Sequence, residues 1–152
     1  MSDTNYIDVF PFSLEKDNLR FLLLQRSQDN SYPGIWQPVA GKVKTGETAW
    51  QAALRELDEE TGLQSIHFYA LDHVSSYYLY PSDRVIHVPA FLAEVPFTTP
   101  RLSGEHDKYQ WLPLDRAVAL ASWQPYRNAL QSVPAFLASA PALALAKISL
   151  EK

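Results

Sequence analysis

The sequence contains no cysteine among its 152 residues, so the chain cannot form disulfides. That absence excludes a small secreted fold held together by disulfides. Residues 1–12 also lack the basic segment and long apolar run that a signal peptide requires. We therefore expect a cytoplasmic, reducing location.

Long apolar runs and an excess of positive charge are missing as well. No stretch reaches the roughly 20 apolar residues of a membrane span, because Pro134, Pro141 and Lys147 interrupt the apolar segment 133–150. The chain has 13 Lys and Arg against 17 Asp and Glu, a formal net charge of -4. Non-specific binding to long nucleic acid needs a basic surface. We therefore expect neither a membrane nor a nucleic acid polymer as a partner.

The composition and length fit a self-sufficient globular fold. The chain is 47% hydrophobic and 20% charged, as is usual for soluble globular proteins. A chain of this length typically forms one domain and buries about 70% of its unfolded surface. We expect a single domain over residues 1–152.

Apolar periodicity and turn residues predict a mixed sheet flanked by helices. Strands are expected at 6–12, 19–25, 36–43, 65–69, 74–80, 84–95 and 108–112. Helices are expected at 48–61, 115–121, 123–131 and 134–139. This order of elements predicts an α+β fold or an α-β-α sandwich.

A run of carboxylates stands out in the helix predicted at 48–61. Four of the five residues 56–60 are Asp or Glu. Like charges three and four positions apart repel each other, whereas a hard divalent cation prefers oxygen ligands. The run therefore indicates either an ordinary solvated acidic face or a metal site suited to phosphate chemistry.

Helical geometry narrows the set of candidate ligands. At about 100° per residue, Glu56, Glu59 and Glu60 share one face, whereas Asp58 points away. Three small residues fall in the same arc and are expected to leave open space above the carboxylates; they are Ala49, Ala52 and Ala53. A separate stripe is expected to bury against the sheet; it consists of Trp50, Leu54 and Leu57.

The spacing around the carboxylates decides between the two interpretations. Residues 41–63 read GKVKTGETAWQAALRELDEETGL. They match G-x5-E-x7-R-E-U-x-E-E-x-G-U, where U is aliphatic, at all nine specified positions, and so the chain resembles the Nudix hydrolases. The resemblance implies a Nudix-type α-β-α sandwich with a mixed sheet. It also implies Mg²⁺-dependent hydrolysis (Mn²⁺ is the alternative ion) of a nucleoside diphosphate linked to another group.

The same resemblance assigns roles to individual residues. The implied metal ligands are Glu56, Glu59 and Glu60, with the backbone carbonyl of Ala40 or Gly41 as a further candidate. Arg55, Glu47 and Gly41 are implied to hold the loop and to orient the glutamates.

The general base is either a glutamate of the box, such as Glu59, or a carboxylate from a distant loop. Glu105 lies in a loop before the strand predicted at 108–112. Several Nudix enzymes that act on nucleoside triphosphates place a catalytic or metal-binding glutamate there, so we expect Glu105 to be the base. Such a base contributes about 10²–10⁴-fold. His106 is expected to be a neighbour or a substrate contact.

Short motifs outside the box resemble the dihydroneopterin triphosphate and dATP pyrophosphohydrolase subgroup. They are WQPVAG at 36–41, EHxxYxWL at 105–112 and SWxxxRxAL at 122–130. One departure is Tyr126, where that subgroup often has asparagine. The resemblance implies cleavage of a nucleoside or pterin triphosphate to a monophosphate and pyrophosphate. A monomer and a homodimer are both compatible with the sequence.

Candidate substrate contacts are Arg26, Trp36, Tyr78 and Trp123. The two tryptophans could stack on a base or pterin ring, and Arg26 could contact phosphate. A tyrosine at about the distance of Tyr78 from the box marks diadenosine tetraphosphate hydrolases, so a diadenosine polyphosphate is the alternative substrate. A nucleotide sensor without hydrolytic activity is a third possibility, disfavoured by the intact box.

Overall fold

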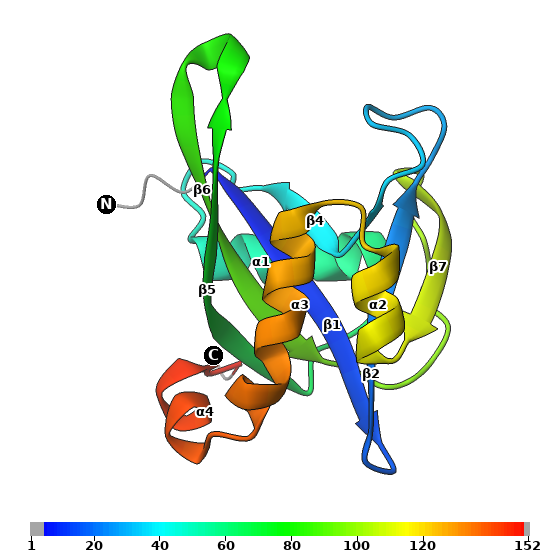
Figure 1. The fold of residues 1–152 in the computed structure, drawn as a ribbon, viewed down its shortest axis with the longest axis vertical. Helices are drawn as coiled ribbons and strands as arrows, with labels where there is room; N and C mark the ends of the chain where they lie inside the picture. The colour runs from blue at the N-terminus through cyan, green and yellow to red at the C-terminus, as the bar shows by residue number, and fades with distance from the viewer. Residues whose placement is uncertain (1–4, 151–152) are drawn as a thin grey trace.

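The computed structural model describes residues 5–150 and shows a mixed sheet with helices on both faces (Figure 1). The strands are β1 (Tyr6–Glu15), β2 (Asn18–Arg26), β3 (Trp36–Gln37), β4 (Val39–Lys42), β5 (His67–Leu79), β6 (Arg84–Glu94), β7 (His106–Leu112) and β8 (Lys147–Ile148). The helices are α1 (Ala49–Thr61), α2 (Leu114–Leu120), α3 (Gln124–Leu137) and α4 (Ala140–Ala146), with a 3-10 turn at Tyr80–Ser82. The predicted α+β sandwich is confirmed.

Strand β1 is the centre of the sheet. Its start, Tyr6–Val9, pairs antiparallel with β4 on one side, and its middle, Asp8–Phe12, pairs parallel with β6 on the other. Its second half pairs with β2, whose far end in turn carries β3 and β7. The start of β1 and the end of β2 thus lie at one end of the sheet, where β4, β3 and the start of β7 also meet.

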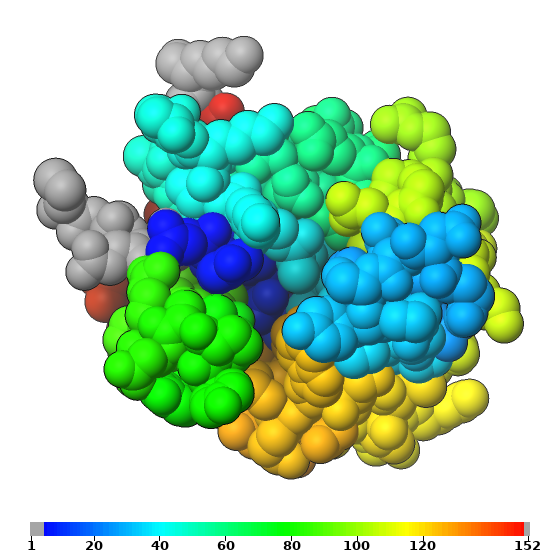
Figure 2. All heavy atoms as spheres, turned by 90° about the horizontal axis from the view of Figure 1, so that it is seen from above, coloured from blue at the N-terminus to red at the C-terminus, as the bar shows by residue number. Residues whose placement is uncertain are grey.

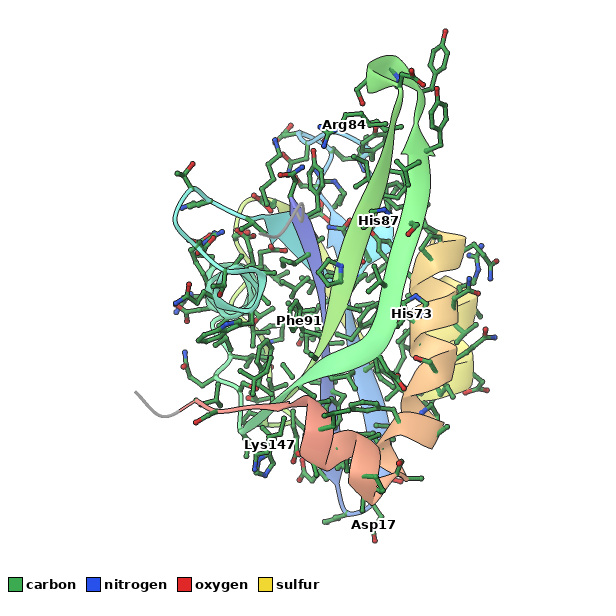
Figure 3. All side chains as sticks on the ribbon, turned by 90° about the vertical axis from the view of Figure 1, so that its left-hand side faces the viewer. Asp17, His73, Arg84, His87, Phe91 and Lys147 are labelled. Carbon is green, nitrogen blue, oxygen red and sulfur yellow. The ribbon has the colours of Figure 1, made fainter. Side chains whose placement is uncertain are left out.

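Two cores lie on opposite faces of the sheet, as the view in Figure 3 shows. Side chains alternate along β1, so Ile7 and Val9 pack under α1, whereas Phe10 and Phe12 pack under α2 and α3. In that view the β5–β6 hairpin extends beyond both layers.

Helix α1 begins and ends where its sequence predicts. The Thr48 hydroxyl accepts a hydrogen bond from the Gln51 N–H at 3.2 Å, and the Gln51 side chain accepts one from the Thr48 N–H at 2.9 Å. This reciprocal pair satisfies two backbone donors at the helix start. Gly62 ends the helix in the left-handed region, with φ 69°, which glycine adopts without steric cost.

The prediction for the faces of α1 was wrong for three residues. Ala52 and Ala53 are fully buried, whereas Trp50 is 38% exposed. The two alanines lie between the helix and the sheet, where a large indole would hold the layers apart. The face of α1 that carries the glutamates is therefore partly buried, because Ala52 and Ala53 on the same face pack against the sheet.

The β5–β6 hairpin and the C-terminal part differ from the predicted elements. Strand β5 is continuous, with a register shift between Ala70 and Val74 where a break was expected. Helix α3 runs through Pro134 instead of stopping before it. Burial of Val133 and Phe136 on either side outweighs the hydrogen bond that the proline removes. Helix α4 and β8 were not predicted.

No single helix among residues 5–150 is long and apolar enough to cross a membrane. Only α3 and α4 together reach the required length and composition, and they are bent by 113° relative to each other.

Candidate active site

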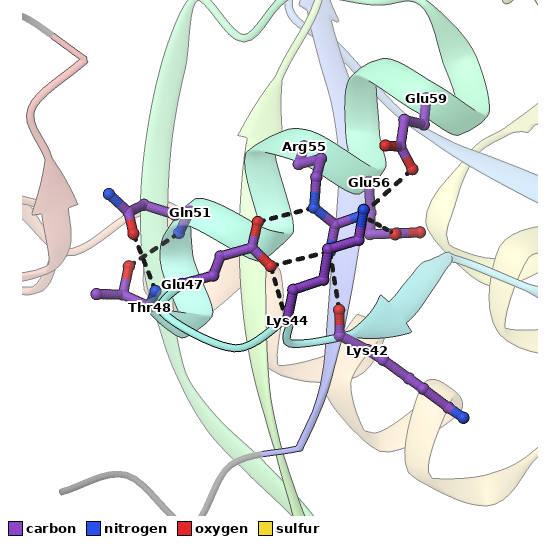
Figure 4. A network of polar contacts seen from close by, with 8 residues as sticks. All are labelled: Lys42, Lys44, Glu47, Thr48, Gln51, Arg55, Glu56 and Glu59. Carbon is purple, nitrogen blue, oxygen red and sulfur yellow. Dashed lines mark hydrogen bonds and ion pairs between the residues drawn. The ribbon is translucent and has the colours of Figure 1, made fainter.

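A network centred on Arg55 fixes the loop before α1 to the helix itself (Figure 4). The guanidinium donates to both carboxylate oxygens of Glu47, at 2.7 and 2.9 Å, and to the Lys42 carbonyl at 2.9 Å. It also pairs with Glu56 and, at 3.2 Å, with Glu59. These hydrogen bonds, with the Lys44 N–H, hold the pKa of Glu47 at about 2. Arg55 therefore stays charged and balances part of the acidic cluster.

Gly41 is required because of its contact with Glu56. A Cβ placed on Gly41 would overlap the side chain of Glu56, whose atoms would be its nearest neighbours. Glu56 is 9% exposed. Its side chain is thus confined between the β4 backbone and the Arg55 guanidinium.

Glu60 is buried, and among the described residues only the Ala40 backbone offsets a small part of the cost of burying its charge. Its exposure is 1%, and neither carboxylate oxygen has a hydrogen-bond partner among the described residues. Burial first, and then the nearby carboxyl of Glu56, raise the pKa of Glu60 far above neutral pH. An isolated buried carboxylate costs several kcal/mol, so the charged form of Glu60 is unfavourable at neutral pH unless a cation binds there.

His106 lies beside Glu60 and is held from the opposite side by Gln37. The His106 Nε2 and the Gln37 side-chain nitrogen are 2.9 Å apart, and the His106 Nδ1 is 3.6 Å from the Glu60 Oε1. Burial, and then the charge of Arg26, lower the pKa of His106 to about 4. The imidazole is therefore neutral at physiological pH. When its Nε2 accepts from Gln37, its proton is at Nδ1 and faces Glu60.

Glu105 reaches the same place from the loop before β7. Its backbone carbonyl accepts hydrogen bonds from the Ser27 N–H at 2.9 Å and the Asn30 side chain at 3.0 Å. Ligand atoms of Glu60, Glu105 and His106 all lie within 4.8 Å of one another. The structure thus brings Glu105 to the glutamates of α1, although about 45 residues separate them in sequence.

These residues fit a divalent cation. Glu56, Glu60 and Glu105 supply carboxylate oxygens, which Mg²⁺ and Ca²⁺ prefer. The unpartnered oxygens of Glu60 are the strongest indication, because a cation would satisfy them. Glu59 differs from the other two glutamates, since its side chain is 52% exposed and faces Arg55. The Ala40 backbone lies close enough to Glu60 to influence its pKa.

A hollow opens beside this cluster. Figure 2 shows it between the β5–β6 hairpin in green, the loop before β3 in light blue and the start of α3 in orange. The start of β1, in dark blue, lies at its bottom. The charges of Asp8, Arg26 and Glu60 all act on the pKa of the buried Tyr126, so the hollow and the acidic cluster are neighbours.

Aromatic side chains are present on the elements that border the hollow, namely the loop before β3, the start of α3 and strand β5. Trp123 stacks on Tyr126 with ring centroids 5.4 Å apart and meets Tyr32 edge-on at 5.8 Å. Burial, and then Tyr6, Asp8 and Tyr32, raise the pKa of Tyr77, which places Tyr77 on the hairpin side. A flat ring system could stack between these walls.

Comparison with known proteins gives the chain its family. The profile of the NUDIX domain matches residues 7–133. The chain belongs to the Nudix family. It is therefore a hydrolase that acts on phosphoric anhydride bonds, and Nudix hydrolases generally use a divalent metal ion.

Individual Nudix proteins resemble the chain over most of its length. The rat bis(5'-nucleosyl)-tetraphosphatase [asymmetrical] is 35% identical over 132 residues, covering 85% of this chain and 88% of its own. The dihydroneopterin triphosphate diphosphatase of Escherichia coli (strain K12) is 31% identical over 129 residues, covering 76% and 83%. A C. elegans Ap4A hydrolase solved as a binary complex superposes with a TM-score of 0.74 at 27% identity, covering 89% and 98%.

The predicted substrate contacts of this Nudix chain lie in different places. The Arg26 guanidinium is held by the Ser31 carbonyl at 2.6 Å, near the hollow. Trp123 directly precedes α3, whose start borders the hollow. Tyr78 instead donates to Asp83 at 2.6 Å at the hairpin tip. Trp36 borders a separate shallow depression with Gln25 and Lys108, among others.

Four residues at or beside the Nudix site received no specific role from the sequence: Asp8, Gln37, Tyr77 and Tyr126. A charged residue in an apolar strand was the available signal for Asp8, since Tyr6–Phe12 is otherwise almost entirely apolar. Gln37 and Tyr126 could not have been assigned, because only the pairing of β2 with β3 and the packing of α3 bring them to the site.

Proposed function

We propose that this Nudix hydrolase uses Mg²⁺, or Mn²⁺ in its place, to cleave a nucleoside or pterin triphosphate to a monophosphate and pyrophosphate. One observation carries the proposal. The buried and unpartnered carboxyl of Glu60, with Glu105 and His106 beside it, lies next to an aromatic hollow. The hollow suits a flat heterocycle, and the acidic cluster suits a metal–phosphate complex.

The metal would be held by the carboxylates of Glu56 and Glu60, with the Ala40 backbone carbonyl as a further candidate. When bound, it supplies charge neutralisation of the phosphate oxygens and lowers the pKa of the attacking water. Glu59, which is exposed beside Arg55, can contribute only by moving its side chain inward.

Glu105 is the general base in this proposal. Its side chain is exposed, and its backbone is held by Ser27 and Asn30, so the carboxylate can reach a water at the mouth of the hollow. Arg55 orients Glu56 through their ion pair. Arg26 is near both His106 and Tyr126, where its guanidinium can pair with a phosphate oxygen.

A second candidate is asymmetrical hydrolysis of a dinucleoside tetraphosphate. The 35% identity to the rat bis(5'-nucleosyl)-tetraphosphatase favours it specifically. The two candidates differ in their products, because the first releases pyrophosphate and the second releases a nucleoside triphosphate with a monophosphate.

Product analysis on a substrate panel tests the proposal. The panel contains dihydroneopterin triphosphate, dATP, GTP and diadenosine tetraphosphate, each incubated with Mg²⁺ and separated by chromatography. We expect monophosphate and pyrophosphate from at least one triphosphate, at a higher kcat/KM than for diadenosine tetraphosphate. The reverse order would select the second candidate, and no turnover of any compound would refute both.

A further inference from the structure

Asp8 is a buried carboxyl group that the proposed chemistry does not use. It is 7% exposed, and its carboxyl has no hydrogen bond or ion pair with any residue from 5 to 150. Among residues 5–150, the side-chain atoms that are buried without a partner belong to Glu60 and His106. The carboxyl oxygens of Asp8 therefore reach the surface, where a bound ligand can contact them.

The strand geometry directs Asp8 into the hollow. Side chains alternate along β1, so Asp8 is on the same face as Phe10 and Phe12, which pack beneath α2 and α3. The start of β1 lies at the bottom of the hollow (Figure 2). The charge of Asp8 acts on Tyr77 of β5 and on Tyr126 of α3, so Asp8 lies near both tyrosines.

The neighbours on the adjoining strands cannot partner this carboxyl. Asp8 is opposite Ala40 on β4 and Ala90 on β6. Neither alanine offers a side-chain donor. Their small size also leaves room above Asp8, which a larger residue at either position would fill.

We propose that Asp8 recognises the heterocycle of the substrate by accepting two hydrogen bonds, one from a ring N–H and one from the adjacent exocyclic amino group. That pair of neighbouring donors is present on guanine and on pterins, so the inference names the substrate class of the proposed function and rests on it. A carboxylate offers only acceptors and matches two parallel N–H donors. Adenine presents an amino group beside a ring nitrogen that is itself an acceptor, so it leaves one carboxylate oxygen facing a lone pair.

Binding measured without turnover tests this inference separately from catalysis. Isothermal titration in EDTA at pH 8 compares GTP, dihydroneopterin triphosphate, inosine triphosphate and ATP. Inosine triphosphate keeps the ring N–H of guanine and lacks only the amino group. A site built to bind that group should reject the analogue, because one hydrogen bond to a charged acceptor is lost. We expect GTP and dihydroneopterin triphosphate to bind about tenfold or more tightly than inosine triphosphate and ATP.

The variant Asp8→Asn should level or reverse this preference, because an amide presents one acceptor and one donor, as the adenine edge requires. Asp72→Asn, which changes an exposed aspartate of β5 in the same way, should keep it. Equal binding of all four compounds by the wild-type protein would overturn the inference, even if Asp8→Asn failed to fold. An unchanged preference in a folded Asp8→Asn would overturn it as well. Discrimination without hydrolysis of any compound would leave the role of Asp8 intact and remove the proposed function.

Discussion

Replacing Glu60 with glutamine should stabilise the metal-free protein at neutral pH. In the folded state, burial raises the pKa of Glu60 far above neutral, whereas in the unfolded chain it is near 4.5. The folded state thus binds one more proton than the unfolded state, and stability falls as pH rises above about 4.5. Near pH 7.5 the cost reaches about three pH units times 1.36 kcal/mol, or roughly 4 kcal/mol. Glutamine is never charged, so it avoids this cost.

Urea unfolding of wild-type protein and Glu60→Gln, in EDTA, gives the difference directly. We expect the variant to be more stable by about 1–4 kcal/mol near pH 7.5 and equal to wild type near pH 4. Glu15→Gln, at the exposed β1–β2 turn, is the matched control and should show neither effect. Saturating Mg²⁺ should stabilise only the wild type, by about 2.7 kcal/mol at 100 times Kd. A metal-free Glu60→Gln no more stable than wild type near pH 7.5 would refute this reasoning.

Three further predictions concern the surroundings of Glu60. Gly41→Ala should displace Glu56, which should lower the free energy of unfolding by about 1–3 kcal/mol and turnover by about tenfold or more. Gly104→Ala is the control: an added Cβ would meet no atom there, so the free energy of unfolding should change little. His106→Gln should be more stable relative to wild type at pH 5 than at pH 7.5, because the buried imidazole of His106 resists protonation between about pH 6.5 and 4 and near pH 5 this costs the wild type about 2 kcal/mol. A difference in urea midpoint between variant and wild type that is the same at both pH values would contradict this. Arg55→Lys should lower kcat, because lysine cannot reproduce the two hydrogen bonds that Arg55 donates to Glu47. An unchanged kcat would show that Arg55 does not orient the glutamates.

Helix α1 shows what the sequence predicts well and where it fails. Its boundaries follow from Thr48 and Gly62, because capping and a left-handed glycine are local effects. The orientation of α1 could not be predicted, since the burial of Ala52 and the exposure of Trp50 depend on how closely the helix approaches the sheet. A helical projection gives angles between residues and says nothing about which arc faces the core.

The candidate site was predicted in part for a similar reason. The spacing of Glu56 and Glu60 is carried within one helix, so the sequence alone identifies them. The loop that brings Glu105 to them was expected only from resemblance, and the structure places it within reach. Asp8 and Tyr126 come from elements far apart in sequence, and only the strand order and the packing of α3 place them around one hollow. No local pattern encodes that arrangement.

The most direct test of the central claim is Mg²⁺-dependent turnover of a triphosphate by wild type and by Glu60→Gln, measured as pyrophosphate release in one experiment. The account predicts turnover by the wild type that EDTA abolishes, and a fall of at least about 10²-fold in the folded variant, comparable to the loss of a general base. Turnover that persists in EDTA, or a Glu60→Gln variant as active as wild type, would contradict it.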